Sequence, residues 1–277
     1  MNKTPTADEV LRAALDALNR GDPAKASRLA LQVLAGAPQN HDAMTVPGAA
    51  RFAILGHPHD VFFLKLRQLG FQPKLAVDVG SYQGDWTRAL KRTFPDARAL
   101  MVEAQPGKAE ALAAVVAELT GVSHCIALAG ERDRDDVVFH VMDTPYGSTG
   151  SSLYPEQTSF PRDTVPLPMR TLDRILAEAG MAGPDLLKID VQGAELDVLA
   201  GAKEALTTVQ FIHMELSTLQ YNAGAPLIAD VLPVLDAAGF VLFDVLEEHR
   251  IAGDLLSQID ALFIRRDSGL RPAGILF

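Results

Sequence analysis

From Gly70 onward, short apolar runs alternate with stretches of helical periodicity, and this alternation constrains the fold more than any other feature of the sequence. Such alternation is typical of a parallel sheet whose strands are connected by crossover helices. The runs are apolar throughout because strands that are covered on both faces have no side that faces water. The chain is therefore predicted to be an α/β protein, with strands at 74–80, 99–104, 123–128, 185–191, 209–216, 240–246 and 261–265.

Two regions depart from this parallel pattern. The polar connection 247–260 between the last two runs is too short for a full crossover helix, so we expect an antiparallel pair at that edge of the sheet. The run at 137–143 indicates an added strand, and residues 144–168 are rich in Gly, Ser, Thr and Pro. This composition predicts a long surface loop of the kind that covers or shapes a site.

The first part of the chain has a different pattern. Residues 7–44 predict two short amphipathic helices around the turn Gly21-Asp22-Pro23, and they resemble a single tetratricopeptide-type hairpin. A solenoid needs about three such repeats, so we expect the hairpin to pack on the main domain or on a second subunit rather than to form a peptide-binding groove. The predicted domains are a helical hairpin at 1–48 and one larger domain at 49–277.

The charge of the chain limits its partners. The formal net charge is −10, whereas proteins that bind nucleic acid use clustered lysine and arginine, so we expect no nucleic-acid partner. No run approaches the roughly 18 apolar residues of a membrane helix, so we expect no membrane partner either. The single cysteine, Cys125, and the absence of a signal-peptide core in the first residues favour a cytoplasmic location.

The strongest local motif is VDVGSYQGDW at 77–86, in which a predicted strand leads through two glycines into a helix. Gly80 allows a tight bend and the close approach of a ligand, and the first amides of the following helix offer hydrogen-bond donors. A dinucleotide fingerprint reads GxGxxG, but here the glycines lie four apart with Tyr82 where the second glycine should be, and no phosphate-binding GxxxxGK[ST] loop is present. The motif therefore disfavours a nicotinamide-dependent dehydrogenase.

Glu103 supplies the second half of a cofactor site. It ends a predicted strand 19 residues beyond Gly84, where an acid that binds both hydroxyls of a ribose is expected. A ribose site without a phosphate site indicates S-adenosylmethionine, and the carboxylate of Asp78 suits the ammonium group of that cofactor, directly or through water. The predicted cofactor-binding residues are Asp78, Gly80, Ser81, Gly84, Glu103, Ala104, Gln105, Ala127 and Asp190.

The sequence also resembles the FkbM family of S-adenosylmethionine-dependent methyltransferases over about residues 50–266, most specifically in LLKIDVQGAE. The resemblance implies a class I, Rossmann-like methyltransferase fold with a seven-stranded, mostly parallel sheet and a C-terminal antiparallel hairpin. It also implies O-methylation of a sugar, polyketide or related metabolite in natural product biosynthesis. The matching segments are VDVGSYQG (77–84), VEAQP (102–106), TLD (171–173), LLKIDVQGAELDVLAGA (186–202), FIHMELS (211–217) and DALFIR (260–265).

Candidate catalytic residues follow from the expected topology. Ligands of open α/β sheets bind outside the carboxyl ends of the strands, so Asp190 and Glu215 are expected to border the methyl acceptor. Either carboxylate is a candidate to accept the hydroxyl proton, and we favour Asp190. His213 lies on the same strand face as Glu215 and is a candidate to orient it, with a hydrogen-bonded core histidine as the alternative. We expect no metal, with a divalent ion on Asp190, Glu215 and a third oxygen donor as the alternative.

The sequence thus predicts an S-adenosylmethionine-dependent O-methyltransferase that acts on a hydroxyl of a small molecule. The flexible segment 147–156 is the expected gate to the acceptor, and Tyr146 and Tyr154 are candidates to stack on it. A homodimer is one assembly in which the helical hairpin would find a partner. The alternative function is a catalytically silent, S-adenosylmethionine-binding scaffold that acts through the hairpin.

Overall fold

The computed structural model describes residues 5–36, 58–144, 147–251 and 254–271. The chain divides into two compact units. The first comprises residues 1–62 with 250–255, and the second comprises residues 63–249 with 256–277.

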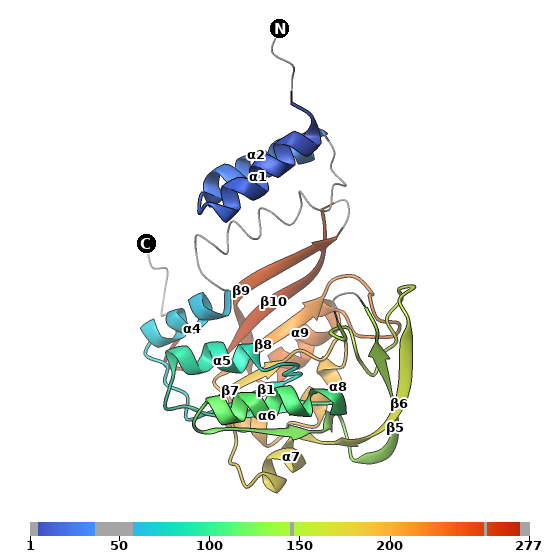
Figure 1. Cartoon of the computed structure of the whole chain (residues 1–277). Helices are drawn as coiled ribbons and strands as arrows, with labels where there is room; N and C mark the ends of the chain where they lie inside the picture. The colour runs from blue at the N-terminus through green and yellow to red at the C-terminus, as the bar shows by residue number, and fades with distance from the viewer. Residues whose placement is uncertain (1–4, 37–57, 145–146, 252–253, 272–277) are drawn as a thin grey trace. The chain divides into compact units, whose positions relative to one another are not determined.

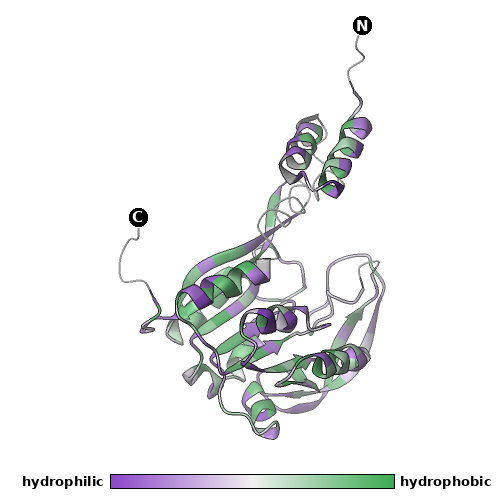
Figure 2. Cartoon of the chain, turned by 60° about the vertical axis from the view of Figure 1, so that its left-hand side comes forward, coloured by the Kyte–Doolittle hydropathy of each residue, from purple (hydrophilic) through white to green (hydrophobic). Residues whose placement is uncertain are grey.

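The first unit contains the helical hairpin of α1 (Ala7–Asn19) and α2 (Pro23–Gly36). The helix α1 begins with a capping box, in which the Thr6 hydroxyl accepts from the Glu9 amide and the Glu9 carboxylate accepts from the Thr6 amide. Figure 2 shows hydrophobic and hydrophilic residues mixed along both helices. Residues 37–44 of the predicted hairpin lie outside the described residues, and the predicted domain boundary at 48/49 stays a prediction. The two helices share an apolar core of Val10, Leu11, Ala14, Ala17, Ala26, Ala30 and Val33.

The second unit is built on a seven-stranded sheet in the order β3-β2-β1-β7-β8-β10-β9 (Figure 1). The strands β3, β2, β1, β7 and β8 run parallel to one another, whereas β10 runs antiparallel to β8. The predicted sheet with its C-terminal antiparallel hairpin is confirmed. The strands are β1 (Leu75–Val79), β2 (Arg98–Glu103), β3 (Val122–Ile126), β7 (Leu186–Ile189), β8 (Phe211–Ser217), β9 (Phe240–Ile251) and β10 (Leu255–Arg265).

Successive side chains of β1 point to opposite faces of the main sheet, and apolar residues pack on both faces. Val77 and Val79 belong to the main apolar core, which also receives side chains from α7, α8 and α9. On the other face, ring contacts join Phe63 of α4 to Trp86 of α5, with centroids 5.1 Å apart. None of the described helices is long and apolar enough to cross a membrane. The helices that accompany the sheet are α4 (Pro58–Gln68), α5 (Asp85–Thr93), η1 (Pro106–Lys108), α6 (Ala109–Glu118), α7 (Leu172–Glu178), α8 (Glu195–Ala200), η2 (Ala205–Thr207) and α9 (Ile228–Ala237).

A second sheet, in the order β4-β6-β5, corrects the predicted loop at 144–168. It consists of β4 (Leu128–Ala129), β5 (Arg134–Met142) and β6 (Arg162–Arg170). The predicted added strand is therefore present as β5, but outside the main sheet, and the predicted loop is wrong for its last part. The strand β6 was not predicted because Pro166 and Pro168 disfavour a strand in the interior of a sheet.

The strand β6 tolerates its two prolines because most of it has a strand partner on one side only. It pairs with β5 from Arg162 to Leu167, whereas its pairing with β4 begins at Met169. Proline, which has no amide hydrogen, is acceptable where a strand has a free edge. Apolar residues alternate with the two prolines, and these residues, Val165, Leu167 and Met169, join a separate small core with Leu128, Val137 and Phe139.

The predicted polar connection 247–260 is also wrong, because β9 extends to Ile251 and β10 begins at Leu255. The ends of these two strands were not predicted because they contain polar residues. These residues lie opposite other polar groups in the sheet. Gln258 and Asp260, for example, lie on β10 opposite Ser217 and Glu215 of β8. The antiparallel pairing predicted for this edge is nevertheless confirmed.

Candidate active site

The turn after β1 is shaped by close contact with the end of β7. Gly80 has φ +78°, and a Cβ at this position would lie 1.8 Å from the backbone oxygen of Asp190. The amides of Gly80 and Ser81 both donate to the Val102 oxygen of β2, at 2.9 and 3.2 Å. Glycine is thus required here by the approach of β7, which adds a second cause to the ligand approach expected from the sequence.

Other predicted cofactor residues also join neighbouring elements. A Cβ on Gly84 would lie 2.9 Å from the side chain of Val115 on α6, so this glycine allows the turn to pack on that helix. The Ser81 hydroxyl donates to the Val102 oxygen at 3.3 Å. The amide of Ala127 donates to the backbone oxygen of Glu103 at 2.8 Å and so joins the ends of β3 and β2.

Glu103 lies at the end of β2 as a fixed carboxylate. One oxygen accepts from the Tyr82 amide at 2.8 Å, and the other accepts from the Gln105 amide at 2.9 Å. The side chain is buried, and burial raises the pKa of Glu103 although these amide hydrogen bonds act in the opposite direction. Each carboxylate oxygen can accept a second hydrogen bond, so the pair suits two neighbouring hydroxyl groups.

Ala104 and Gln105 connect this strand end to other parts of the unit. Ala104 packs against the small core of the second sheet. Gln105 donates from Nε2 to the Ser148 oxygen at 3.3 Å, which ties the predicted gate segment to the predicted cofactor side of the site.

A buried ion network lies between the ends of β1 and β7. The ammonium of Lys188 is 3.3 Å from Asp78 Oδ1 and 3.2 Å from Asp190 Oδ2, and it donates to the Gly80 oxygen. These carboxylates raise the pKa of Lys188 although burial opposes them. Asp78 is fully buried and also accepts from the Thr87 hydroxyl at 2.7 Å, whereas the side chain of Asp190 is 30% exposed. Asp190 is therefore the carboxylate of this network that a ligand can reach directly.

Gln192 joins the two candidate catalytic carboxylates. It donates from Nε2 to Asp190 Oδ1 at 3.1 Å and to Glu215 Oε1 at 2.6 Å, from a backbone with φ +56°. Gln258 of β10 donates to the same Glu215 oxygen at 2.7 Å. Burial, together with the nearby charges of Asp190 and Asp260, raises the pKa of Glu215 well above its usual value. Neither glutamine is among the residues predicted from the sequence, although Gln192 lies within the most specific motif, LLKIDVQGAE.

His213 is a buried histidine whose two ring nitrogens are both engaged. The indole N–H of Trp86 donates to Nδ1 at 2.9 Å, so Nε2 carries the proton that Asp260 Oδ1 accepts at 3.0 Å. Asp260 is the cross-strand partner of Glu215. His213 therefore holds the neighbour of Glu215, and this arrangement leaves it no ring nitrogen for a substrate proton.

His249 of β9 approaches the other oxygen of Asp260, with Nε2 2.9 Å from Oδ2. This hydrogen bond raises the pKa of His249 to about 9. The two histidines hold the pKa of Asp260 well below its usual range although burial opposes them. Asp260 and His249 are not among the residues predicted from the sequence, because only the pairing of adjacent strands brings them to Glu215.

Glu195, at the start of α8, gives a measurable pH dependence. It is buried and accepts from the Gly193 amide at 2.9 Å, and burial raises its pKa from 4.5 to about 7. The folded state therefore binds this proton more tightly than the unfolded state. The stabilising contribution is fully present below about pH 4.5 and is lost as the pH rises through about 7, a change of about 3 kcal/mol.

We expect Glu195→Gln to remove this pH dependence. Glutamine keeps an oxygen for the Gly193 amide and carries no charge at any pH. Urea unfolding should show similar stabilities for the variant and the wild type near pH 4.5, and a variant more stable by up to about 3 kcal/mol at pH 8. Glu204→Gln, at an exposed position, should leave the pH profile unchanged. An equal stability difference at both pH values would contradict the assignment.

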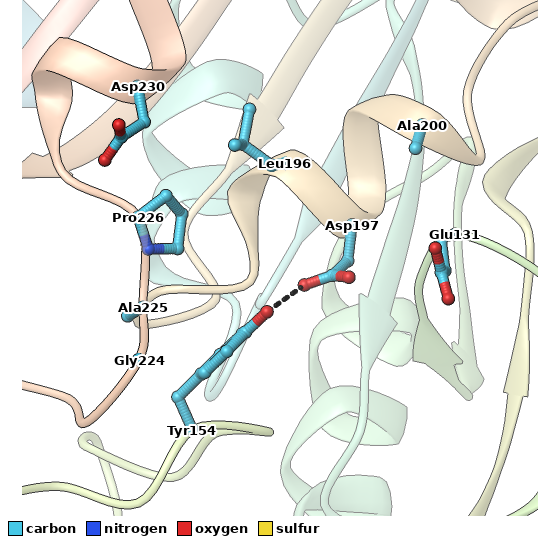
Figure 3. A pocket seen from close by; sticks show the side chains of 9 residues that line it. All are labelled: Glu131, Tyr154, Leu196, Asp197, Ala200, Gly224, Ala225, Pro226 and Asp230. Atoms are coloured by element: carbon cyan, nitrogen blue, oxygen red, sulfur yellow. Dashed lines mark hydrogen bonds between the residues drawn. The ribbon is translucent and has the colours of Figure 1, made fainter.

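A pocket of about 460 Å³ lies beside α8 (Figure 3). Tyr154 reaches it from the predicted gate segment and donates from its hydroxyl to Asp197 Oδ2 at 3.0 Å. Tyr146, the other tyrosine proposed for stacking, lies outside the described residues. The pocket is lined by Glu131, Tyr154, Leu196, Asp197, Ala200, Gly224, Ala225, Pro226 and Asp230.

The strand order 3-2-1-7-8-10-9, with a glycine turn after β1 and an acid at the end of β2, defines the chain as a class I methyltransferase fold. Residues 78–242, more than half of the chain, match the Methyltransferase FkbM domain. The chain belongs to this family of enzymes, as the sequence motifs predicted.

Known proteins resemble parts of the chain. A segment of 67 residues is 49% identical to the 2-O-methyltransferase NoeI of Sinorhizobium fredii (strain NBRC 101917 / NGR234), over 23% of this chain and 28% of that protein. The N-terminal domain of EvdMO1, solved with SAH and D-fucose, has a TM-score of 0.43 and 18% identity, over 76% of this chain and 83% of that one. A precorrin-6y C5,15-methyltransferase from Geobacter metallireducens GS-15 has a TM-score of 0.41 and 11% identity, over 74% and 87%.

Proposed function

We propose that the protein is an S-adenosylmethionine-dependent O-methyltransferase that acts on a hydroxyl of a small molecule. The observation that carries the proposal is Glu103, a buried carboxylate that two backbone amides hold beside the glycine turn. Its free acceptor capacity fits the two hydroxyls of a ribose, and the turn lacks the glycine that a pyrophosphate would need. Membership of the FkbM family supports the same cofactor.

Glu103 and Asp190 have different roles in the proposed methyl transfer. When bound, the cofactor supplies an electrophilic methyl group on sulfur. Glu103 holds the ribose end, and the site aligns the acceptor hydroxyl, an effect that can contribute about 7–11 kcal/mol. Asp190 would take the proton of the acceptor hydroxyl, whose oxygen would receive that methyl group. A positioned base of this kind contributes about 10²–10⁴-fold to the rate.

The surroundings of Asp190 favour a neutral or cationic acceptor over an acidic one. Glu195, Asp190 and Asp260 all affect the pKa of Glu215, so four carboxyl groups lie within electrostatic reach of one another. Lys188 and the protonated His249 offset part of this charge, and the remaining excess of acidic groups disfavours an anionic substrate. The name of the relative NoeI, a 2-O-methyltransferase, supports a hydroxyl as the accepting group.

Calorimetry with S-adenosylhomocysteine tests the cofactor assignment. We expect Glu103→Gln and Glu103→Ala to bind it about 10- to 150-fold more weakly than the wild type, because a hydrogen bond to a charged group contributes about 1.5–3 kcal/mol. Glu110→Gln, at an exposed position on α6, should bind it normally. Unchanged affinity in both Glu103 variants, or a wild type that does not bind, would contradict the proposal.

Incubation of the protein with radiolabelled S-adenosylmethionine and extracts of its source organism tests the reaction. Label on a base-stable ether of a small molecule is the expected result. Cofactor binding without transfer to any component would favour the scaffold alternative. In that case, deletion of residues 1–48 should abolish the capture of partner proteins.

A further inference from the structure

We propose that Glu215, His249 and Asp260 form a binding site for a divalent transition-metal ion of the Mn²⁺ or Zn²⁺ class. The three residues come from the adjacent strands β8, β9 and β10, and each offers one ligand atom within 4.8 Å of the other two. This proposal replaces our expectation that the protein binds no metal. It differs from the alternative considered in the sequence analysis, because Asp190 is not one of the ligands.

The observed distances suit coordination. His249 Nε2 lies 2.9 Å from Asp260 Oδ2. Two ligand atoms at right angles, each about 2.1 Å from an ion, are about 3.0 Å apart, so an ion can replace the proton between these atoms with little movement. A set of one imidazole and two carboxylates suits Mn²⁺ or Zn²⁺, whereas Mg²⁺ and Ca²⁺ prefer oxygen ligands alone.

In both Asp260 and Glu215, the carboxylate oxygen that would not bind the ion accepts hydrogen bonds from the protein. Asp260 Oδ1 accepts from His213, which Trp86 in turn fixes. Glu215 Oε1 accepts from Gln192 and Gln258, whereas Oε2 accepts no hydrogen bond from the part of the chain that the structure describes. Such outer hydrogen bonds orient ligands in metal sites. They leave Glu215 Oε2 and Asp260 Oδ2 for an ion.

The charge balance separates this cluster from the buried network beside it. Asp78 and Asp190 share the ammonium of Lys188. Among the described residues, by contrast, neither Glu215 nor Asp260 pairs with a lysine or arginine, and the cluster is open to solvent at His249, whose side chain is 40% exposed. Among the described residues, the charged partners of Asp260 are histidines, of which His249 can release its proton when it binds a metal, so a cation from solution can reach these two carboxylates.

The role of the ion rests on the proposed function. Gln192 contacts both Glu215 and Asp190, so an ion on Glu215 would lie next to the proposed base. A metal ion in this position can bind the acceptor oxygen and polarise its hydroxyl for proton transfer to Asp190. The site would then select acceptors that offer an oxygen ligand beside the methylated hydroxyl, such as a vicinal diol.

Metal analysis of the full chain tests the site. After dialysis against a chelator, titration with Mn²⁺ followed by electron paramagnetic resonance, and with Zn²⁺ followed by elemental analysis, should give one bound ion per chain. We expect His249→Gln and Asp260→Asn to weaken Mn²⁺ or Zn²⁺ binding at least tenfold. His124→Gln, on the distant strand β3, should bind as the wild type does. Thermal unfolding should show that His249→Gln, at a partly exposed position, stays folded.

Two results would overturn the proposal. The first is a wild type that retains neither ion above the level of the His249→Gln variant, which would leave a histidine–carboxylate ion pair only. The second is unchanged affinity in both ligand variants. Ion binding is read without methyl transfer, so one bound ion per chain in a protein without transferase activity would contradict the proposed function and not the site. Full methyl transfer by chelated protein would remove the ion from the reaction.

Discussion

The Asp190→Asn variant is expected to lose about 10²–10⁴-fold in methyl-transfer turnover while its affinity for S-adenosylhomocysteine changes by less than about tenfold. The loss follows from the removal of the partly exposed carboxylate to which we assign the hydroxyl proton. Asparagine preserves the shape of the side chain, and its amide oxygen can still accept from Lys188 or Gln192. Steady-state kinetics with the acceptor identified by radiolabelling, together with calorimetry, measure the two effects.

Glu215→Gln is the matched comparison, because Glu215 is the other carboxylate bound by Gln192. A large loss in Asp190→Asn with a smaller loss in Glu215→Gln supports the proposed roles. Near-normal turnover of Asp190→Asn would remove Asp190 from the mechanism. If the loss appeared in Glu215→Gln instead, the proton-accepting role would move to Glu215.

The Gly80→Ala variant is expected to lose more than about 4 kcal/mol of unfolding free energy, beyond the usual range for point substitutions. The left-handed backbone alone costs about 1–2 kcal/mol for a residue with a Cβ. The larger part comes from the contact of 1.8 Å with the Asp190 oxygen, a backbone atom that only a shift of β7 can relieve. For a domain of this size, the melting temperature should fall by about 10 °C or more.

Gly107→Ala provides the control for Gly80→Ala. A Cβ on Gly107 would meet no atom within 4 Å, and this glycine lies in the short helix η1. Its melting temperature should stay within a few degrees of the wild type. If Gly80→Ala were as stable as Gly107→Ala, the close approach of β7 to the turn would be refuted.

The sequence patterns predicted the parts of the fold that depend on burial. Strands such as β1 and β7 are buried along their whole length because helices cover both faces, and apart from Asp78 and Lys188 they are apolar, so such runs are recognisable locally. The strand β6 escaped because its prolines occupy a free edge, and the ends of β9 and β10 escaped because polar residues occupy them. In both regions, backbone pairing with neighbouring strands defines the strand, whereas prolines or polar side chains interrupt the apolar pattern by which a strand is recognised in a sequence.

The residues of the candidate site were likewise predicted only where a local pattern marks them. Asp190 and Glu103 could be predicted because each ends or directly follows an apolar strand. Gln192 lay within a recognised motif, yet its role depends on a side chain that spans two strands. Asp260 and His249 depend on a pairing register between strands, which no local pattern in the sequence specifies.

The small sheet of β4, β6 and β5 has its own apolar core, distinct from the core of the main sheet. The gate segment that contains Tyr154 belongs to the excursion between β5 and β6, and Gln105 touches it through a single backbone oxygen. Under the proposed function, the segment that would contact the acceptor is thus separate in the sequence from the strand ends that carry Glu103 and Asp190. An exchange of residues 134–170 between relatives would be expected to change the acceptor and keep the ends of β1, β2, β7 and β8 only where the bonds that hold this stretch are kept, such as those from Tyr154 to Asp197 and from Asn222 to the Tyr154 oxygen.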